Sequence, residues 1–383
     1  MNDDLPMLMT KIVRPPLFRL RKSPRWAQFG LAALVLAGCV GDPGMGAQRA
    51  VPAAMPRPVA QTYAIPKPEP AVIRSRPPEA LVATIRQLGS SFNGNVGIAV
   101  RRIDTDWEVA YNGNALMPQH SVSKLWVAMT LLDAVDRGKL TLTDTATIRP
   151  QDLTLFHQPI AQMVSKEGYT TSLADLMHRA MTESDNTAND TVLRKVGGPE
   201  AVRGFLARRF ISNVRFGPGE RSMQSAAAGL DWDQSLSRGR AFYVARDRLP
   251  LSVRRKALDA YLASPPDGAA ASGIALALAR LKRGEMLSPG STATLLATMH
   301  EAKTGPQRIK GGVPAGWSYA HKTGTGQILA PRSTGFNDVG VMTAPDGTSY
   351  AVAVMIGSTT ASIPERWALM QGVARAVAAN HRR

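Results

Sequence analysis

The segment that decides the fold is QHSVSK (residues 119–124), which leads into the apolar run LWVAMTLL (residues 125–132). The run predicts a buried helix, and Ser121 and Lys124, three residues apart, then share one face of its first turn. A serine hydroxyl is a weak nucleophile until a base takes its proton, and a partly desolvated lysine can be that base. A helix cap followed by an exposed lysine would explain the same residues, and Ser-x-x-Lys arises by chance about once in a chain of this length. The catalytic interpretation therefore depends on partners elsewhere in the chain.

A second segment, TESDN (residues 182–186), supplies candidate partners. It places Ser184 and Asn186 just before a helical segment that ends at Gly197-Gly198. The same composition caps ordinary helices, so taken alone it favours a structural role.

A third segment, KTGTG (residues 322–326), follows the strand-like WSYAH (residues 317–321). A strand edge there can present Lys322 and two threonines to a cleft. Lys-Thr-Gly also occurs at residues 303–305, at the end of a predicted helix and before Pro306. Lysine and glycine are ordinary signals for the end of a helix, so we assign no catalytic role to that copy.

Composition excludes several classes of protein. The chain has 383 residues, of which 44% are hydrophobic, enough for one large globular domain or two smaller ones. The net charge is +17, which favours anionic partners such as lipid headgroups or cell-envelope polymers. Nucleic acid is a poorer candidate because only 6% of the residues are aromatic. One cysteine and six scattered histidines predict neither a disulfide nor a metal site, and no phosphate-binding loop or other cofactor motif is present.

The N-terminal segment has the organisation of an export signal. Residues 1–26 are basic and residues 27–37 are apolar, a stretch too short to span a bilayer comfortably. It ends in LAGC (residues 36–39), which resembles the lipobox of bacterial lipoproteins, whose cysteine is acylated. We therefore predict a signal peptide over residues 1–38, a lipid anchor on Cys39 and a periplasmic location, with the outer membrane favoured over the inner. An ordinary signal peptide with a chance cysteine is the alternative.

Residues 39–78, rich in proline, alanine and glycine, predict an extended tether, and residues 79–383 a folded domain. Within it, hydrophobic periodicity predicts one antiparallel sheet built from both ends of the domain, flanked by helices, with an all-helical lobe inserted between them. This is a mixed α/β (α+β) fold with its active site between the lobes. The expected helices are 80–92 and 364–379, and the expected strands are 95–103, 107–111, 317–321, 337–343 and 348–356.

The three segments occur in the order Ser-x-x-Lys, Ser-Asp-Asn, Lys-Thr-Gly, and on these motifs residues from about 79 to 383 resemble the class A serine β-lactamases and penicillin-recognising serine hydrolases. The resemblance implies that Ser121 is the nucleophile, Lys124 a base and Ser184 a proton relay. It also implies that Asn186 binds the substrate's side-chain amide. Lys322, Thr323 and Thr325 would bind its carboxylate.

The resemblance extends to a glutamate that activates water in class A enzymes. ERSMQ (residues 220–224) keeps the glutamate, with Met223 in place of the family's leucine and Gln224 in place of its asparagine. Glu220 and Gln224 would hold the water that releases the acyl group. A surface glutamate among basic neighbours, here Arg215 and Arg221, is the alternative.

The chain departs from the family in length after Gln224. Residues 225–266 form a probable insert, rich in arginine, which could be a helical hairpin over the cleft, a lid, a wall-binding surface or a solvated elaboration. No arginine occupies an obvious family position for the substrate carboxylate; Arg332 is the first choice and Arg366 the second. Phe156 resembles the aromatic gate at the rim, although a core role would explain it equally.

The expected function is β-lactam hydrolysis by a monomeric enzyme that needs no cofactor or metal. A D-alanyl-D-alanine peptidase or transpeptidase would use the same serine on cell-wall peptides, and a penicillin-binding sensor would stay acylated. Glu220 is the residue that discriminates among these functions, because only rapid deacylation requires it.

Overall fold

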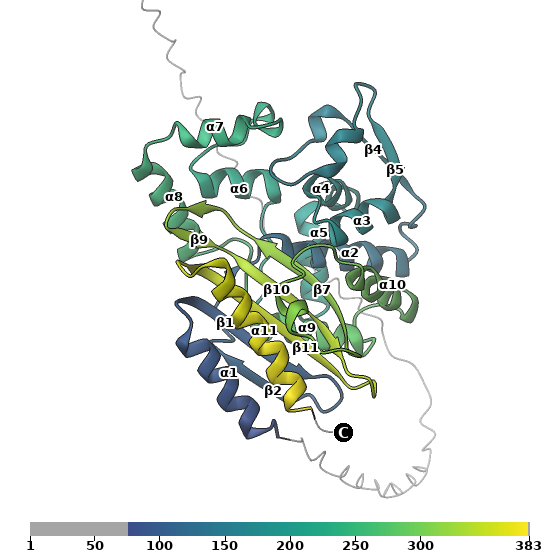
Figure 1. Cartoon of the computed structure of the whole chain (residues 1–383). Coiled ribbons are helices and arrows are strands. Elements are labelled where there is room, and N and C mark those ends of the chain that lie inside the picture. The colour runs from purple at the N-terminus through teal and green to yellow at the C-terminus, as the bar shows by residue number, and fades with distance from the viewer. Residues whose placement is uncertain (1–75, 382–383) are drawn as a thin grey trace, which may run out of the picture. The chain divides into compact units, whose positions relative to one another are not determined.

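The computed structural model describes residues 76–381, so the predicted leader, Cys39 and almost all of the predicted tether lie outside the described residues (Figure 1). Across residues 76–381 no helix is long and apolar enough to cross a membrane. The first helix, α1 (Glu79–Ser91), begins where the folded domain is expected to begin.

A seven-stranded antiparallel sheet joins the two ends of the domain, as predicted. Its first strand in the chain pairs with its last, so residues more than 250 positions apart lie side by side: Ile98 faces Val354 across the ladder. The main path runs β2 (Glu108–Tyr111), β1 (Gly94–Arg102), β11 (Ser349–Thr359), β10 (Phe336–Thr343) and β7 (Ser318–Thr325); β9 (Arg332–Thr334) adds to β11 and β8 (Ile328–Leu329) to β9.

Side chains alternate between two cores across this sheet, as its period of two requires. Val96, Ile98 and Val100 of β1 face α1 and α11 (Ile363–Ala379). The opposite face of the sheet carries small residues such as Ala99 and Ala353, which belong to the core shared with α9 (Ala271–Lys282). The sheet is thus covered by helices on both faces (Figure 1).

The inserted lobe surrounds α2 (Lys124–Asp136), in which every residue from Lys124 to Ala134 is buried. A helix that is apolar all round belongs in the centre of a lobe, which is why LWVAMTLL specifies the fold. The helices around it are α3 (Leu173–Thr182), α4 (Asn186–Lys195), α5 (Gly198–Arg208) and α10 (Pro289–His300), with a small ladder of β4 (Thr145–Ile148) and β5 (Tyr169–Ser172).

The predicted insert folds into helices. After α6 (Glu220–Ala228) come a short turn (Gln234–Ser237), α7 (Ala241–Asp247) and α8 (Leu251–Ala263). The chain then returns to the body of the domain through β6 (Gly268–Ala269), which pairs with β3 (Met117–Pro118) just before the Ser121 segment. Both ends of the insert therefore lie against the segments that carry the candidate active site.

Candidate active site

Ser121 and Lys124 are brought together as the sequence predicts. Ser121 lies in a 3-10 turn (His120–Ser123) immediately before α2, rather than in the first turn of the α-helix itself, and Lys124 begins α2. The Lys124 Nζ is 2.7 Å from the Ser121 Oγ and 2.7 Å from the Asn186 Oδ1. Burial lowers the pKa of Lys124, which increases the fraction of neutral amine able to accept the serine proton.

Ser184 and Lys322 form a second pair from opposite lobes. Ser184 precedes α4, Lys322 lies in β7, and the Lys322 Nζ donates to the Ser184 Oγ at 3.1 Å. Lys322 is fully buried; burial, followed by the charges of Lys124 and Arg308, lowers its pKa well below the usual value. A lysine in this setting can exchange a proton with the serine hydroxyl.

Asn186 is held by its own helix terminus. Asp185 caps α4 by accepting from the Ala188 N–H at 2.9 Å and also accepts from the Ile160 N–H at 2.6 Å. This places the Asn186 Oδ1 against Lys124, while its Nδ2 donates to the Leu155 carbonyl at 2.8 Å. Asn186 therefore lines the cleft and orients Lys124 at the same time.

Glu220 lines the cleft, although the predicted insert follows it closely in the chain. It is the first residue of α6, where a carboxylate is favoured by the helix dipole, and it is only 7% exposed. The Gln224 Nε2 donates to the Glu220 Oε1 at 3.2 Å, and the Gln327 Nε2 donates to the Gln224 Oε1 at 3.1 Å. Gln224 is thus oriented with its amide nitrogen towards the glutamate. The N-terminus of α6 and the amide of Gln224 hold Glu220 in place. A glutamate in an exposed basic loop would have neither contact.

Thr323 and Thr325 of β7 line one end of the cleft. Thr304 and Arg308 line the same end, and neither was predicted from the sequence. The Arg308 Nη2 donates to the Thr325 Oγ1 at 2.6 Å, and the Thr304 and Thr323 hydroxyls are 2.7 Å apart. Arg308 is held by the Gly324 and Asn337 carbonyls, and burial lowers its pKa to about 10. It remains a cation at neutral pH.

The prediction that Arg332 or Arg366 meets the substrate carboxylate is wrong. Arg332 lies in β9 and pairs with Asp259 of α8 at 2.5 Å, outside the cleft. The Arg366 side chain is buried at the start of α11, bonded to the Ser333 hydroxyl and the Ala361 carbonyl, and is not a cleft residue either. The arginine beside Thr323 and Thr325 is Arg308, three residues after the Lys-Thr-Gly copy to which no role was assigned. That discarded triplet supplies Thr304, so its resemblance to the third motif was the available signal.

Three residues at or beside the cleft have a strained backbone. His120, Phe156 and Ser184 all have positive φ, at 51°, 61° and 63°. Such conformations persist in non-glycine residues only where the surroundings enforce them, and they are typical of functional sites. His120 fits because Gly326 and Gly335 lack side chains: a Cβ on Gly326 would lie 2.4 Å from its Nε2. Burial lowers the pKa of His120 to about 4, so the ring beside the nucleophile is neutral at physiological pH.

Phe156 lies at the rim and also packs against the insert. Its ring centroid is 4.8 Å from that of Phe242 and 5.9 Å from that of Tyr243, both in α7. The insert thereby becomes part of the cleft wall, to which α7 contributes Tyr243 and Arg246.

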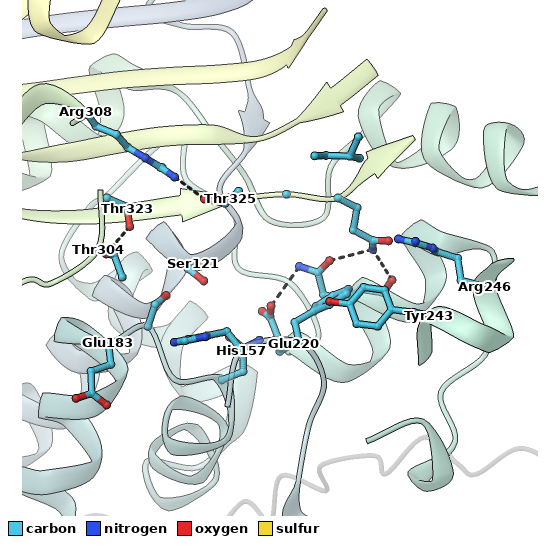
Figure 2. A pocket seen from close by; sticks show the side chains of 17 residues that line it. Ser121, His157, Glu183, Glu220, Tyr243, Arg246, Thr304, Arg308, Thr323 and Thr325 are labelled. Carbon is cyan, nitrogen blue, oxygen red and sulfur yellow. Dashed lines mark hydrogen bonds between the residues drawn. The ribbon is translucent and has the colours of Figure 1, made fainter. Parts of the chain in front are cut away.

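Together these residues enclose a cleft of about 530 Å³ between the lobes. Figure 2 shows Ser121 in the middle, with Thr304, Thr323, Thr325 and Arg308 towards one end and Tyr243 and Arg246 towards the other. His157, at the rim, and Glu183, which pairs with Lys303 at 2.8 Å, also line the cleft.

Among residues 76–381 no group of three or more histidine, cysteine, aspartate or glutamate side chains is placed to hold a metal ion. The side chains that meet at Ser121 are a nucleophile, two amines and a carboxylate. Such a set can perform acyl transfer through a covalent intermediate with proton transfer.

Comparison with known proteins gives a consistent result. Residues 80–381 match the model of the "Beta-lactamase enzyme family". The chain is 29% identical to the extended-spectrum β-lactamase PER-1 of Pseudomonas aeruginosa, over 73% of this chain and 80% of that protein. It is 24% identical to the β-lactamase VEB-1 of the same organism, over 75% and 86% of the two chains.

Two solved structures have a fold similar to that of this chain. A β-lactamase from Chitinophaga pinensis superposes with a TM-score of 0.64 at 25% identity, covering 77% of this chain and 97% of that one. An ancestral class A β-lactamase gives 0.62 at 27% identity, covering 78% and 99%.

Proposed function

The chain belongs to the β-lactamase enzyme family, in its class A serine branch, and we propose that it hydrolyses the cyclic amide of β-lactams through an acyl-enzyme on Ser121. The observation that carries this proposal is the meeting of Ser121, Lys124 and Glu220 at one cleft, with Lys124 in hydrogen-bond contact with the serine. Ser121 and Lys124 act in the formation of the acyl-enzyme. Glu220 serves the hydrolysis that separates a β-lactamase from a protein that stays acylated.

In acylation, the Ser121 Oγ bonds to the lactam carbonyl carbon and the ring C–N bond breaks. Lys124 takes the hydroxyl proton directly, or Glu220 takes it through a water, a choice that remains disputed for the family. The leaving nitrogen receives a proton from the Ser184 hydroxyl, which is replenished by Lys322 at 3.1 Å. The N–H groups of Ser121 and Thr325 form the proposed oxyanion hole, where one donor typically contributes about 3 kcal/mol.

In deacylation, Glu220 takes a proton from a water whose oxygen attacks the ester carbonyl. The ester C–O bond breaks, and the proton held by Glu220 passes to the Ser121 oxygen, which restores both groups. Gln224 orients Glu220 through their direct hydrogen bond, and its longer side chain replaces the family's asparagine. The net reaction adds one water across the amide bond, so no cofactor is required.

The substrate carboxylate is placed at the end of the cleft formed by Thr323, Thr325 and Lys322. Arg308, whose guanidinium donates to the Thr325 hydroxyl, adds a positive charge to this end. An anion bound there holds the lactam carbonyl near Ser121.

The test is turnover of a chromogenic cephalosporin by the purified protein, beside Ser121→Ala and a D-alanyl-D-alanine peptide. We expect hydrolysis of the cephalosporin, none by Ser121→Ala and little cleavage of the peptide. Cleavage of the peptide without turnover of the cephalosporin would instead identify a cell-wall peptidase.

We also propose that the enzyme is exported and anchored through an acylated Cys39 at the periplasmic face of the outer membrane. The support is the sequence LAGC after a basic and apolar leader. Several acyl chains would anchor the protein stably, since each buried methylene contributes about 0.8 kcal/mol. Removal of residues 1–38 takes away +4 of the +17 net charge, and the remaining +13 would favour contact with anionic envelope polymers.

A further inference from the structure

The end of the cleft farthest from Arg308 has no function in the mechanism above, yet it carries a second cation. It is formed by α7 of the insert, which contributes Tyr243 and Arg246 to the cleft wall (Figure 2). In a penicillin or cephalosporin the ring carboxylate and the acylamino side chain project from opposite ends of the fused rings. If the carboxylate lies at Thr323 and Thr325, the acyl side chain extends towards α7.

We propose that Tyr243 and Arg246 form a subsite that recognises β-lactams whose acyl side chain carries its own carboxylate. This inference rests on the proposed function and adds a substrate preference to it.

The aromatic contacts of α7 fix this wall in place. Phe242 is 2% exposed, and its ring centroid is 4.8 Å from that of Phe156 and 5.8 Å from that of Tyr243. The Arg246 guanidinium lies over the Tyr243 ring, 5.3 Å from its centroid. A guanidinium stacked in this way is oriented before a ligand arrives, which reduces the entropy lost on binding.

The charge near Arg246 is only partly neutralised. Asp247 Oδ1 lies 3.1 Å from Arg246 and 3.4 Å from Arg254, so one carboxylate faces two guanidinium groups and the cluster carries a net +1. Asp247 is 55% exposed and does not line the cleft, whereas the Arg246 side chain is 17% exposed and does. Glu220, a carboxylate that lines the cleft, accepts a hydrogen bond from Gln224. A ligand carboxylate at the α7 end therefore meets a cation with spare hydrogen-bond donors.

The test compares benzylpenicillin with carbenicillin, which differs from it by one carboxylate on the side chain. The quantity measured is the ratio of kcat/KM for carbenicillin to that for benzylpenicillin. Arg246→Gln removes a partly exposed, charge-assisted hydrogen bond to the side-chain carboxylate, so we expect it to lower the ratio about 5- to 10-fold. Arg246→Lys should retain most of the ratio. Arg248→Gln, an exposed residue just after α7, is the matched control and should leave the ratio unchanged.

Asp247→Asn should raise the ratio, because it frees Arg246 from its competing carboxylate, and it carries the test if Arg246→Gln does not fold. An unchanged ratio in Arg246→Gln, an equal fall in Arg248→Gln, or a fall in Asp247→Asn would overturn the subsite. Hydrolysis of benzylpenicillin with an unchanged ratio would overturn the subsite and leave the proposed function intact. If neither penicillin is hydrolysed, the ratio of their acylation rates on Ser121 is measured by adduct mass; the absence of any adduct overturns both proposals.

Discussion

At the scale of single residues, the site depends on burying groups that would ordinarily be charged. Lys124 and Lys322 are both buried, and the charge of Lys124 adds to burial in lowering the pKa of Lys322. Asp190 of α4 is a third such group. Burial, followed by the charge of Glu220, raises the pKa of Asp190 to about 6, and one of its carboxyl oxygens has no hydrogen-bond partner.

The raised pKa predicts how Asp190 affects stability. Well below the ordinary carboxyl pKa of 3.8 the group is protonated in both the folded and the unfolded state, so it costs nothing. As the pH rises from the ordinary value of 3.8 through the folded pKa of about 6, the unfolded state releases this proton first, so stability falls across that range, and above it the fold carries the full cost of a buried carboxylate. Asp190→Asn should therefore raise the free energy of unfolding at pH 8 by about 3 kcal/mol at most and barely change it at pH 4. Urea denaturation at both pH values checks this, with the exposed Asp231→Asn as control. An equal gain at both pH values would show that ionisation is not the cause.

Arg308 gives a second prediction at this scale. If it assists binding of the substrate carboxylate, Arg308→Gln should reduce the preference for benzylpenicillin over its methyl ester about 10-fold, since a charge-assisted bond is worth about 1.5–3 kcal/mol. Arg332→Gln, which removes a cation outside the cleft, should leave this preference unchanged. A larger effect of Arg332→Gln than of Arg308→Gln would restore the arginine that the sequence suggested.

At the scale of elements, the insert is tied directly to the turn that bears the nucleophile. Asp267, just past α8, accepts the Gln119 and His120 backbone N–H groups at 3.1 and 2.8 Å. The Tyr261 hydroxyl of α8 donates to the other oxygen of the same carboxylate at 2.9 Å. The path from α8 to Ser121 therefore consists of buried hydrogen bonds.

This connection predicts unequal costs for two substitutions. Tyr261→Phe removes one hydrogen bond to a carboxylate and should lower the free energy of unfolding by about 1–2 kcal/mol. Asp267→Ala leaves two backbone N–H groups and a tyrosine hydroxyl without their acceptor, and should cost about 3–5 kcal/mol and reduce kcat by misplacing Ser121. Thermal denaturation and turnover of the cephalosporin measure both effects. Equal small losses would mean that the insert is independent of the active site.

The helices and strands also show how much of the fold and of the site could be predicted from the sequence. Periodicity predicted β1, β10, β11, α1 and α11, because each is a segment rich in apolar residues with clear ends. Ser121, Ser184 and Lys322 could be grouped only because their motifs occur in a known order. Arg308 lies in a loop with no periodic pattern, and the nearby signal was the second Lys-Thr-Gly, three residues before it, to which no catalytic role was assigned. The contribution of α7 to the cleft depends on contacts with Phe156 across almost 90 residues, which no local pattern encodes.

At the scale of the whole molecule, the cleft exists because the chain returns to its first strand. β7, which presents Lys322 and Thr325, is held in the sheet by β10, and β10 by β11, which pairs with β1. The helical lobe that carries Ser184 is inserted between these two sets of strands. Neither lobe alone contains both amines and both serines.

The proposed anchor predicts the behaviour of the full chain in cells. Cys39→Ser should prevent acylation and release the protein from the membrane fraction, while turnover of the cephalosporin by the folded domain stays unchanged. Fractionation of cells followed by an activity assay measures both quantities. Persistent attachment of Cys39→Ser to membranes would contradict the lipid anchor.

The central claim is that Ser121 is acylated by β-lactams and that Glu220 drives release of the acyl group. The most direct measurement is the intact mass of wild-type protein and Glu220→Gln, quenched seconds after mixing with benzylpenicillin, with peptide mapping of any adduct. The prediction is that Glu220→Gln accumulates one penicilloyl group on Ser121, while the wild type carries little and turns over. Accumulation in the wild type to the same extent, or an adduct on any residue other than Ser121, would contradict the account.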